Sequence, residues 1–332
     1  MIGAKLLFSL GVLYLLLYLF DGAQVRDYIL SLHPLVFAGA VALLGLQALL
    51  INLRWVLVMG AAQANVGYPT GLRILLISFW FNLALPTVGS DVARVWMLRK
   101  VGVGLHSSIR GVLADRVVGL SAIAALVAVG LPLLLRRTDD TPATLAVSTL
   151  LVLGLAAIAI LTTLDRWPQR ALSNSLIAEV ANIGGFLRFL LLGYPRRGAL
   201  FGAAIGVHLS TIAACLLLAY GLDANLSPLD ALIVVPPVIM LSALPISVGG
   251  WGVREGAMVA GLMLVGVTPG KALGLSILLG LAIVAIGICG GILWVLSEDL
   301  QAPHRKVLKR LRTAAATDGP AGEADTPKDV AL

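Results

Sequence analysis

Two short stretches of this sequence carry groups that could bind a phosphate, and both interrupt apolar runs. LPTVGSDVAR occupies residues 85–94, and LPISVGGWGVRE occupies residues 244–255. Each stretch places an arginine, Arg94 or Arg254, a few residues after a Leu-Pro pair and at least one glycine. The planar guanidinium of arginine matches phosphate oxygens with paired hydrogen bonds. Because the pattern occurs in both halves of the chain, it predicts a shared function.

The prolines and glycines of these stretches predict interrupted helices. Pro86 and Pro245 each end or kink a helix. Glycines follow both prolines and allow backbone conformations that other residues resist: they are Gly89, Gly249 and Gly250. A new helix after each break would present free N–H groups and a positive dipole end, which together bind phosphate. We expect Ser90 to cap the first of these helices.

Other charged and polar residues in apolar segments extend the expected site. The further candidates for phosphate binding are Arg54, Arg116 and Asn82. Three carboxylates lie near arginines in the sequence and are expected to act as charge partners or to take up protons: Asp91, Asp115 and Glu255. Charges inside a membrane cost roughly 2.5–3.5 kcal/mol on insertion scales, which favours a functional use. The alternative is that Asp91 with Arg94, and Glu255 with Arg254, neutralise each other in a packed core.

The composition requires that membrane helices position these residues. Of the 332 residues, 59% are hydrophobic and 12% are charged, whereas soluble domains carry roughly 25% charged residues. Apolar runs of about 20 residues, enough to cross a hydrocarbon core of ~30 Å, recur along the chain. The sequence therefore predicts an all-α polytopic membrane protein.

About six full transmembrane helices are expected, and two further apolar segments contain the interrupted stretches. The spans are predicted at about 4–20, 34–59, 109–135, 143–164, 198–220 and 272–296. The run 4–20 is interpreted as a retained span, because no small-x-small cleavage site follows it. We expect residues 72–99 and 229–267 to form re-entrant helical hairpins. Segment 72–99 is too short for two crossings, while two ordinary spans fit 229–267 almost as well.

The order span, hairpin, span occurs twice, at about 34–135 and 198–296. The additional span 143–164 between them would invert the second copy, as in the inverted repeats of many transporters, whose broken helices meet near the midplane. Residues 170–192 carry an apolar stripe and are expected to form an interfacial helix between the repeats.

The distribution of basic residues orients the chain and separates its tail. Basic loops stay in the cytoplasm, which places both termini on the cytoplasmic side of the cell membrane. The membrane domain is expected to cover 1–300. The tail, 301–332, begins with the basic segment HRKVLKRLR at 304–312 and is then expected to be disordered, lying against anionic lipid headgroups. Nucleic acid is not an expected partner, because no folded basic domain is present.

Several classes of protein are disfavoured by missing motifs. The sequence has no GxxxxGK[ST] loop, so ATP-driven transport by this chain alone is not expected. Its four histidines are scattered without metal-ligand spacing. We expect neither a metal nor another cofactor, and we find no catalytic constellation.

Four segments form a recognisable set: NLRW at 52–55, FNLALPTVGSDVARVWMLRK at 81–100, LADRVVGL at 113–120 and LPISVGGWGVREG at 244–256. Taken together, they resemble the signature blocks of the lysylphosphatidylglycerol-synthase transmembrane (flippase-like) family. The resemblance covers most of residues 1–300. Thr87 and Ser90 occupy part of a two-glycine stretch that precedes the aspartate in the family, so the backbone there is expected to differ. The resemblance implies a lipid-translocating domain without the soluble aminoacyl-transferase domain of some relatives, and lysyl transfer is not expected.

Three functions follow from these observations. The leading hypothesis is a flippase or scramblase-like transporter, which moves an anionic phospholipid or a polyprenyl-phosphate-linked lipid through a midplane cavity. An alternative is a membrane-embedded lipid-phosphate enzyme, with Asp91 or Asp115 as base and the arginines stabilising the oxyanion. A third hypothesis is an accessory subunit that presents lipid to a glycosyltransferase or another lipid-modifying enzyme.

Overall fold

The computed structural model describes residues 2–84, 89–138, 140–166, 175–244 and 250–297, and these are almost entirely helical. No strand occurs within these ranges, which agrees with the predicted all-α class. The expected helix breaks at Pro86 and Pro245, the substituted Thr87, the loop residue Gly249 and the tail from 301 lie outside the described residues.

Five helices in the described ranges are long and apolar enough to cross a membrane: α3 (Pro34–Ala61), α6 (Leu105–Arg137), α7 (Thr141–Thr163), α9 (Arg197–Gly221) and α12 (Pro269–Leu296). They correspond to five of the six expected spans. The expected span 4–20 lies in α1 (Ile2–Leu19), an apolar helix of 18 residues, and its crossing of the membrane stays a prediction. The helical membrane architecture is thus confirmed, with five candidate spans within the described ranges. The short helix α2 (Gly22–Ser31) follows α1 and is capped by the Asp21 side chain.

Two pairs of short helices occupy the segments that were expected to form hairpins. The first pair is α4 (Tyr68–Ala84) and α5 (Gly89–Lys100); the second is α10 (Pro228–Ser242) and α11 (Val253–Met263). The partners within each pair pack against each other. With 17, 12, 15 and 11 residues, these helices are shorter than the about 20 residues of a perpendicular crossing.

The expected interfacial segment 170–192 contains α8 (Ser175–Arg188) and a π-helical turn, Phe189–Gly193. Helix α8 packs against α7 and α6. Ile183 and Leu187, two members of the apolar stripe, are buried within the protein. The amphipathic pattern therefore identifies a helix whose C-terminal half packs against the neighbouring helices.

The loops that end α3 and α9 have the same conformation. Gln63 and Asp223 adopt left-handed backbone angles, with φ of 58° and 50°. In each loop the following residue, Ala64 or Ala224, donates its N–H to a carbonyl five residues earlier, at 2.9 and 2.8 Å. These matched bonds close both helix ends in the manner of a Schellman motif.

The loops that follow α5 and α11 are also alike. Each has the sequence Val-Gly-Val, and the central Gly102 and Gly266 have φ of 90° and 85°, which only glycine adopts readily. The next residue, Val103 or Val267, donates its N–H to a carbonyl five residues earlier at 3.0 Å. The run α3–α6 therefore matches the run α9–α12 in helix order and in two loop conformations.

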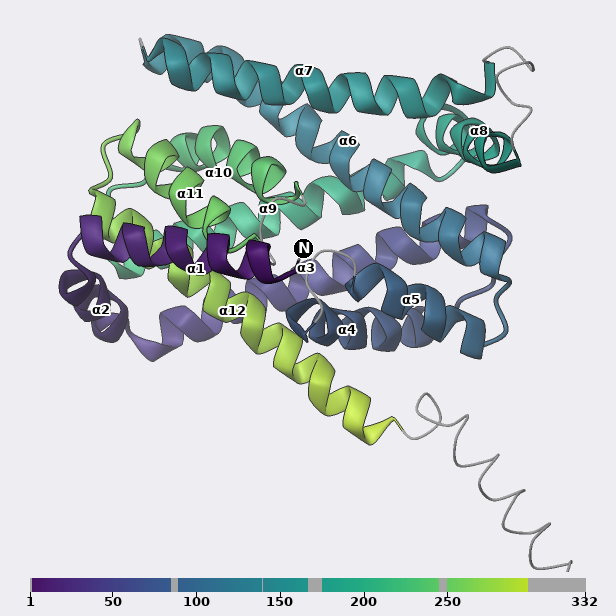
Figure 1. Cartoon of the computed structure of the whole chain (residues 1–332), viewed down its shortest axis with the longest axis horizontal. Coiled ribbons are helices and arrows are strands. Elements are labelled where there is room, and N and C mark those ends of the chain that lie inside the picture. The colour runs from purple at the N-terminus through teal and green to yellow at the C-terminus, as the bar shows by residue number, and fades with distance from the viewer. Residues whose placement is uncertain (1, 85–88, 139, 167–174, 245–249, 298–332) are drawn as a thin grey trace, which may run out of the picture. The chain divides into compact units, whose positions relative to one another are not determined.

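Helices α3 and α9 are the first of each run and share the largest helix–helix interface among the described elements. Figure 1 shows both of them near the centre of the view, surrounded by the other helices. Helix α6 packs against α3, α5, α7 and α9. Helices α4 and α12 approach so closely that a Cβ on Gly290 would collide with the Leu76 carbonyl. These contacts bring helices of both runs around a common interior, where the charged residues lie.

Candidate functional site

Asp115 binds two arginines in the interior of the protein. Arg54 of α3 donates from Nε and Nη2 to the two carboxylate oxygens of Asp115 on α6, at 2.7 and 3.1 Å. Arg94 of α5 donates from Nη1 to Asp115 Oδ2 at 3.2 Å. All three side chains are at most 8% exposed. Since two cations share one carboxylate, this network carries an excess positive charge.

Further contacts fix the two arginines within the bundle. Arg94 Nε donates to Ser78 Oγ of α4 at 3.3 Å, and its guanidinium carbon lies 5.3 Å from the centre of the Trp55 ring. A Cβ on Gly119 would lie 2.9 Å from Arg54 Nη1, so the absence of a side chain there makes room for this arginine. Helix α5 is therefore attached to α3, α4 and α6 through the polar contacts of Arg94.

Arg116 and Asp91 form a second, more exposed pair. Arg116 Nη2 lies 3.0 Å from Asp91 Oδ1, and it also donates to Ser90 Oγ at 3.3 Å. The side chains of Arg116 and Asp91 are 54% and 28% exposed. Asp91 thus pairs with Arg116, and not with Arg94 as the packed-core alternative supposed. Ser90 was expected to cap α5; instead, the helix begins at Gly89 and Ser90 lies inside its first turn.

Arg254 and Glu255 form the third network, as the packed-core alternative expected. Arg254 donates from Nε, at 3.1 Å, and from Nη2 to Glu255 Oε1. The other carboxylate oxygen of Glu255 accepts the backbone N–H of Gly252 at 2.6 Å, which caps α11. Ser276 Oγ of α12 donates to Oε1 at 3.4 Å. The guanidinium carbon of Arg254 lies 4.7 Å from the centre of the Trp251 ring. Glu255 therefore holds one edge of the arginine.

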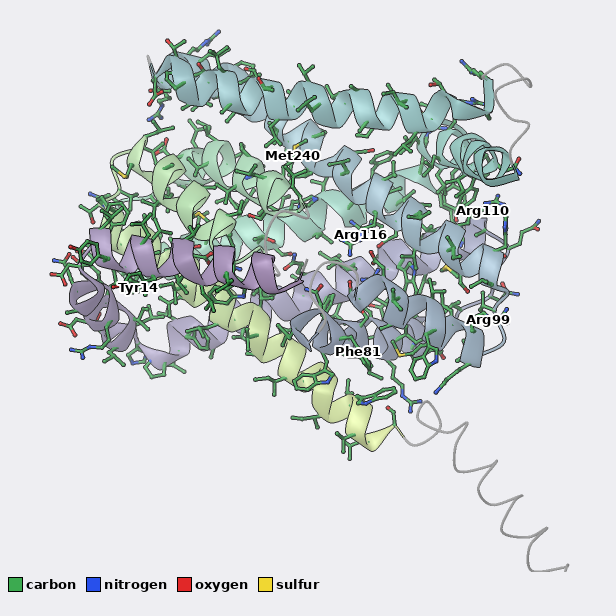
Figure 2. The ribbon with its side chains drawn as sticks, viewed as in Figure 1. Tyr14, Phe81, Arg99, Arg110, Arg116 and Met240 are labelled. Atoms are coloured by element: carbon green, nitrogen blue, oxygen red, sulfur yellow. The ribbon has the colours of Figure 1, made fainter. Side chains whose placement is uncertain are left out.

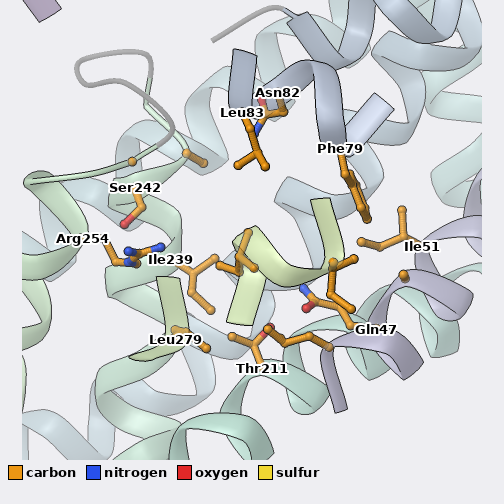
Figure 3. Close-up of a pocket in the computed structure, with 16 residues that line it drawn as sticks. Gln47, Ile51, Phe79, Asn82, Leu83, Thr211, Ile239, Ser242, Arg254 and Leu279 are labelled. Atoms are coloured by element: carbon orange, nitrogen blue, oxygen red, sulfur yellow. The ribbon is translucent and has the colours of Figure 1, made fainter. Parts of the chain in front are cut away.

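Glycines with positive φ precede α11, as the sequence predicted for this stretch. Gly250 and Gly252 have φ of 83° and 85°, a region that other residues seldom adopt. They bring the chain to the start of α11 so that Arg254 reaches the interior. Figure 3 shows the result: Arg254 and Ser242 lie on one side of a cavity, and Gln47 lies across from them.

This cavity has a volume of about 330 Å³ and lies between α3, α4, α9, α10, the start of α11 and α12. Arg254 is the one charged residue in its described lining. Aliphatic side chains and Phe79 form most of the remaining wall. Polar lining side chains complete the site: Gln47, Asn82, Thr211 and Ser242. The cavity can accommodate a small polar or anionic group inside an otherwise apolar bundle.

The structure places the expected site residues in separate groups. Arg54, Arg94 and Asp115 meet in the first network, and Ser90, Asp91 and Arg116 meet in the second. Arg254, Asn82 and Gly250 line the cavity, with Glu255 bound to Arg254. Gly89 is buried at the start of α5. Arg94 is not part of the cavity lining. A single phosphate site shared by Arg94 and Arg254 stays a prediction.

Sequence reasoning missed three polar residues of the cavity: Gln47, Thr211 and Ser242. Each is an uncharged residue in an apolar helix, and its type alone does not distinguish it from other interhelical polar residues. The available indication that these residues share a site was the matching helix order of α3–α6 and α9–α12, because it brings α3, α9 and α10 to a common centre. Among the described residues, no group of three His, Cys, Asp or Glu side chains is placed to hold a metal.

Apolar helices of spanning length, two short helix pairs and ionised groups buried between them define a polytopic helical membrane protein with a polar interior cavity. The chain belongs to the family described as the lysylphosphatidylglycerol synthase TM region, whose model matches residues 2–298. No curated protein matches the chain. No solved structure matches it either.

Proposed function

We propose that the protein translocates an anionic lipid across the cell membrane, with the lipid headgroup passing through the cavity beside Arg254. One observation carries this proposal. The side chain of Arg254 is only 8% exposed, and it lines a cavity between apolar helices of spanning length. An ionised group is costly at membrane depth, and such groups mark substrate paths. Membership of a family named for a lipid synthase supports a lipid-related role.

The hydrogen bonds of Arg254 leave a donor for a ligand. Its Nε and Nη2 groups bind Glu255, while Nη1 makes no hydrogen bond to a described residue. Glu255 in turn is held by Gly252 and Ser276, so it orients the guanidinium. A phosphate oxygen would receive a charge-assisted hydrogen bond from Nη1, and the planar fork favours arginine over lysine here.

Charge and size both favour a headgroup as the cavity's occupant. The network of Arg54, Arg94 and Asp115 adds a net positive charge to the same bundle, which favours an anion over a cation or a zwitterion. A cavity of about 330 Å³ lies at the lower end of ligand pockets, which occupy ≈ 300–1,000 Å³. It suits a headgroup whose acyl or prenyl chains remain among the lipids.

The matched loops support an inverted repeat of α3–α6 and α9–α12, which we propose as the basis of transport. The additional span α7 between the runs would invert the second copy, and the short pairs α4–α5 and α10–α11 would enter the membrane as re-entrant hairpins from opposite faces. In this arrangement residues 60–67, 100–104 and 165–197, together with both termini, would lie in the cytoplasm, the side on which basic loops are retained.

Cysteine accessibility tests this arrangement. In a background without Cys215 and Cys289, cysteines introduced at Gln63 and Val101 are expected to react with an impermeant reagent from the cytoplasmic face. A cysteine at Asp223 should react from the opposite face, because inversion reverses the second run. All three positions are exposed. Reaction of positions 63 and 101 from opposite faces would rule out the first hairpin, and reaction of 223 from the cytoplasm would rule out inversion.

Reconstitution tests the function. Purified protein in liposomes is expected to move fluorescent phosphatidylglycerol or a labelled polyprenyl phosphate between leaflets without ATP, and faster than the same lipid moves in protein-free liposomes. The lipid gradient, or protons taken up by Asp91, Asp115 or Glu255, would drive net movement. Recovery of a chemically altered lipid would instead support the enzyme hypothesis. Neither movement nor alteration would support an accessory role beside a glycosyltransferase or other lipid-modifying enzyme.

A further inference from the structure

A second cavity, separate from the one at Arg254, opens where α3 ends. Its volume is about 490 Å³. It lies between the end of α3, the first turns of α6, and α8 with the π-helical turn that follows. Its lining consists of Ala61, Ala62, Gln63, Arg110, Gly185, Phe186 and Phe189, none of which lines the cavity at Arg254. Figure 2 shows Arg110, the one charged residue among the described lining residues, on α6 close to α8.

Arg110 has an aromatic partner, and its Nε has no polar partner within the described part of the chain. Its guanidinium carbon lies 4.1 Å from the centre of the Phe186 ring, a cation–π contact that fixes the plane of the group. Its Nε is buried and has no hydrogen-bond partner among the described residues. A buried donor without an acceptor is costly, more so when it belongs to a charged group. The arrangement therefore lacks an acceptor.

The acidic residue beside this cavity is already engaged. A Cβ on the lining residue Gly185 would lie 3.4 Å from Asp165. Both oxygens of Asp165 are held by Arg188, at 2.7 and 2.6 Å. Hydrogen bonds from Arg188 lower the pKa of Asp165, so the carboxylate is ionised and neutralises Arg188. The charge of Arg110 remains uncompensated by this pair.

A comparable site, in which the cation is satisfied, lies beside the corresponding loop of the second run. Lys271, near the start of α12, donates to the backbone carbonyl of Asp223 and lies 6.0 Å from the ring centre of Tyr28. Asp223 occupies the same left-handed loop position as Gln63. Both sites thus combine a helix-end loop, a cation and an aromatic ring. In the second site the loop itself supplies the acceptor, whereas the first site has a cavity there.

We propose that the cavity at Arg110 and Phe186 binds a phosphate group as the missing acceptor. Phosphate accepts charge-assisted hydrogen bonds from guanidinium edges, and the amide of Gln63 supplies a further donor at the rim. The group comes either from an anionic lipid headgroup or from free phosphate. This site does not depend on the proposed transport function.

Binding measurements on the purified full chain test the proposal. Native mass spectrometry would follow titrations with phosphatidylglycerol, with diacylglycerol as the lipid without phosphate, and with inorganic phosphate. Arg110→Gln is expected to weaken phosphatidylglycerol binding at one site by roughly ten- to a hundredfold. Diacylglycerol binding should be unaffected. If Arg110→Gln also weakens the binding of inorganic phosphate, the cavity is a general phosphate site. If only the binding of phosphatidylglycerol is weakened, the cavity is a site for a lipid headgroup.

Lys271→Gln is the matched control, because it removes a cation that lies beside the corresponding loop of the second run. It should leave both titrations unchanged. Phe186→Leu should weaken binding by a few-fold through loss of the ring, since a cation–π contact contributes about 0.5–2 kcal/mol. Arg110→Lys retains the charge and should bind phosphatidylglycerol more tightly than Arg110→Gln does. If Arg110→Gln does not fold, the binding measured for Arg110→Lys and Phe186→Leu tests the proposed site.

Equal binding by Arg110→Gln and the unchanged protein would overturn the proposal, as would an equal loss in Lys271→Gln. Transport measured on the same variants separates this site from the one at Arg254. Loss of this binding with transport retained would support the Arg110 site as an independent one. Failure of the lipid transport assay by the unchanged protein would leave the binding result intact.

Discussion

Asp115→Ala is expected to lower the free energy of unfolding by about 3–5 kcal/mol, the cost of removing one partner from a buried ion pair. The variant takes away the carboxylate that Arg54 and Arg94 share at 2.7–3.2 Å in an interior where both arginines are at most 8% exposed. Two cations would then remain buried side by side. Unfolding of the purified protein in mixed micelles with increasing dodecyl sulfate, followed by circular dichroism, measures the loss.

Asp91→Ala is the control for this prediction. It removes a carboxylate from an arginine in the same part of the protein, but Arg116 is 54% exposed and Asp91 28% exposed. Such pairs contribute about 0–1 kcal/mol. Replacing the network as a whole, with Arg54→Met, Arg94→Met and Asp115→Leu, should recover most of the stability. Equal losses in Asp115→Ala and Asp91→Ala would show that the buried network does not stabilise the bundle.

Arg254→Gln is expected to abolish most lipid transport while the protein remains folded. The side chain contributes the one charged group among the described residues of the cavity lining. A hydrogen bond to a charged group contributes about 1.5–3 kcal/mol, so lipid affinity should fall roughly ten- to a hundredfold. Glutamine retains a donor for Glu255, which also keeps its bonds to Gly252 and Ser276. Arg254→Lys should restore transport in part, because lysine keeps the positive charge but lacks the planar pair of N–H donors of the guanidinium.

Arg116→Gln provides the comparison, since it removes an exposed arginine from the same domain. If Arg254→Gln folds and still transports lipid at the full rate, the cavity is not part of the transport mechanism. A purely structural role predicts a lower unfolding midpoint that Glu255→Gln relieves. Combining Arg254→Gln with Arg94→Gln tests the hypothesis of a shared phosphate: non-additive losses would place both arginines on one ligand, and additive losses would assign them to separate sites.

The helical membrane class and most of the helix positions follow from local features of the sequence. Five expected spans coincide with α3, α6, α7, α9 and α12, because long apolar runs are a property of the chain itself. The unusual backbone before α11 was likewise predictable, since Gly250 and Gly252 adopt positive φ, which glycine allows through its own backbone. The run at 4–20 was counted as a further span on the same grounds as the other five; it coincides with α1 (Ile2–Leu19), and its crossing of the membrane stays a prediction.

The partners of the charged residues could not be predicted in the same way. Asp91 and Arg94 are three residues apart, and such neighbours can pair on one helix. In the folded protein Arg94 turns to Asp115, 21 residues away, and Arg54 joins from 61 residues away. These choices depend on how α3, α5 and α6 pack, which no local pattern encodes. Arg254 and Glu255, adjacent in sequence, pair as expected because no long-range packing is required.

The difference between a long-range and an adjacent ion pair has a consequence for motion. Arg94 joins α5 to Asp115 on α6, so a displacement of α5 would separate buried charges and would be opposed by several kcal/mol. Arg254 and Glu255 lie on the same helix, and Glu255 also caps it through Gly252. A displacement of α11 would carry this ion pair along as a unit, with the hydrogen bond from Ser276 as the polar contact to α12 that must break. The electrostatics therefore make α5 the fixed side of the bundle and leave α11, which carries the cavity's arginine, as the element able to move.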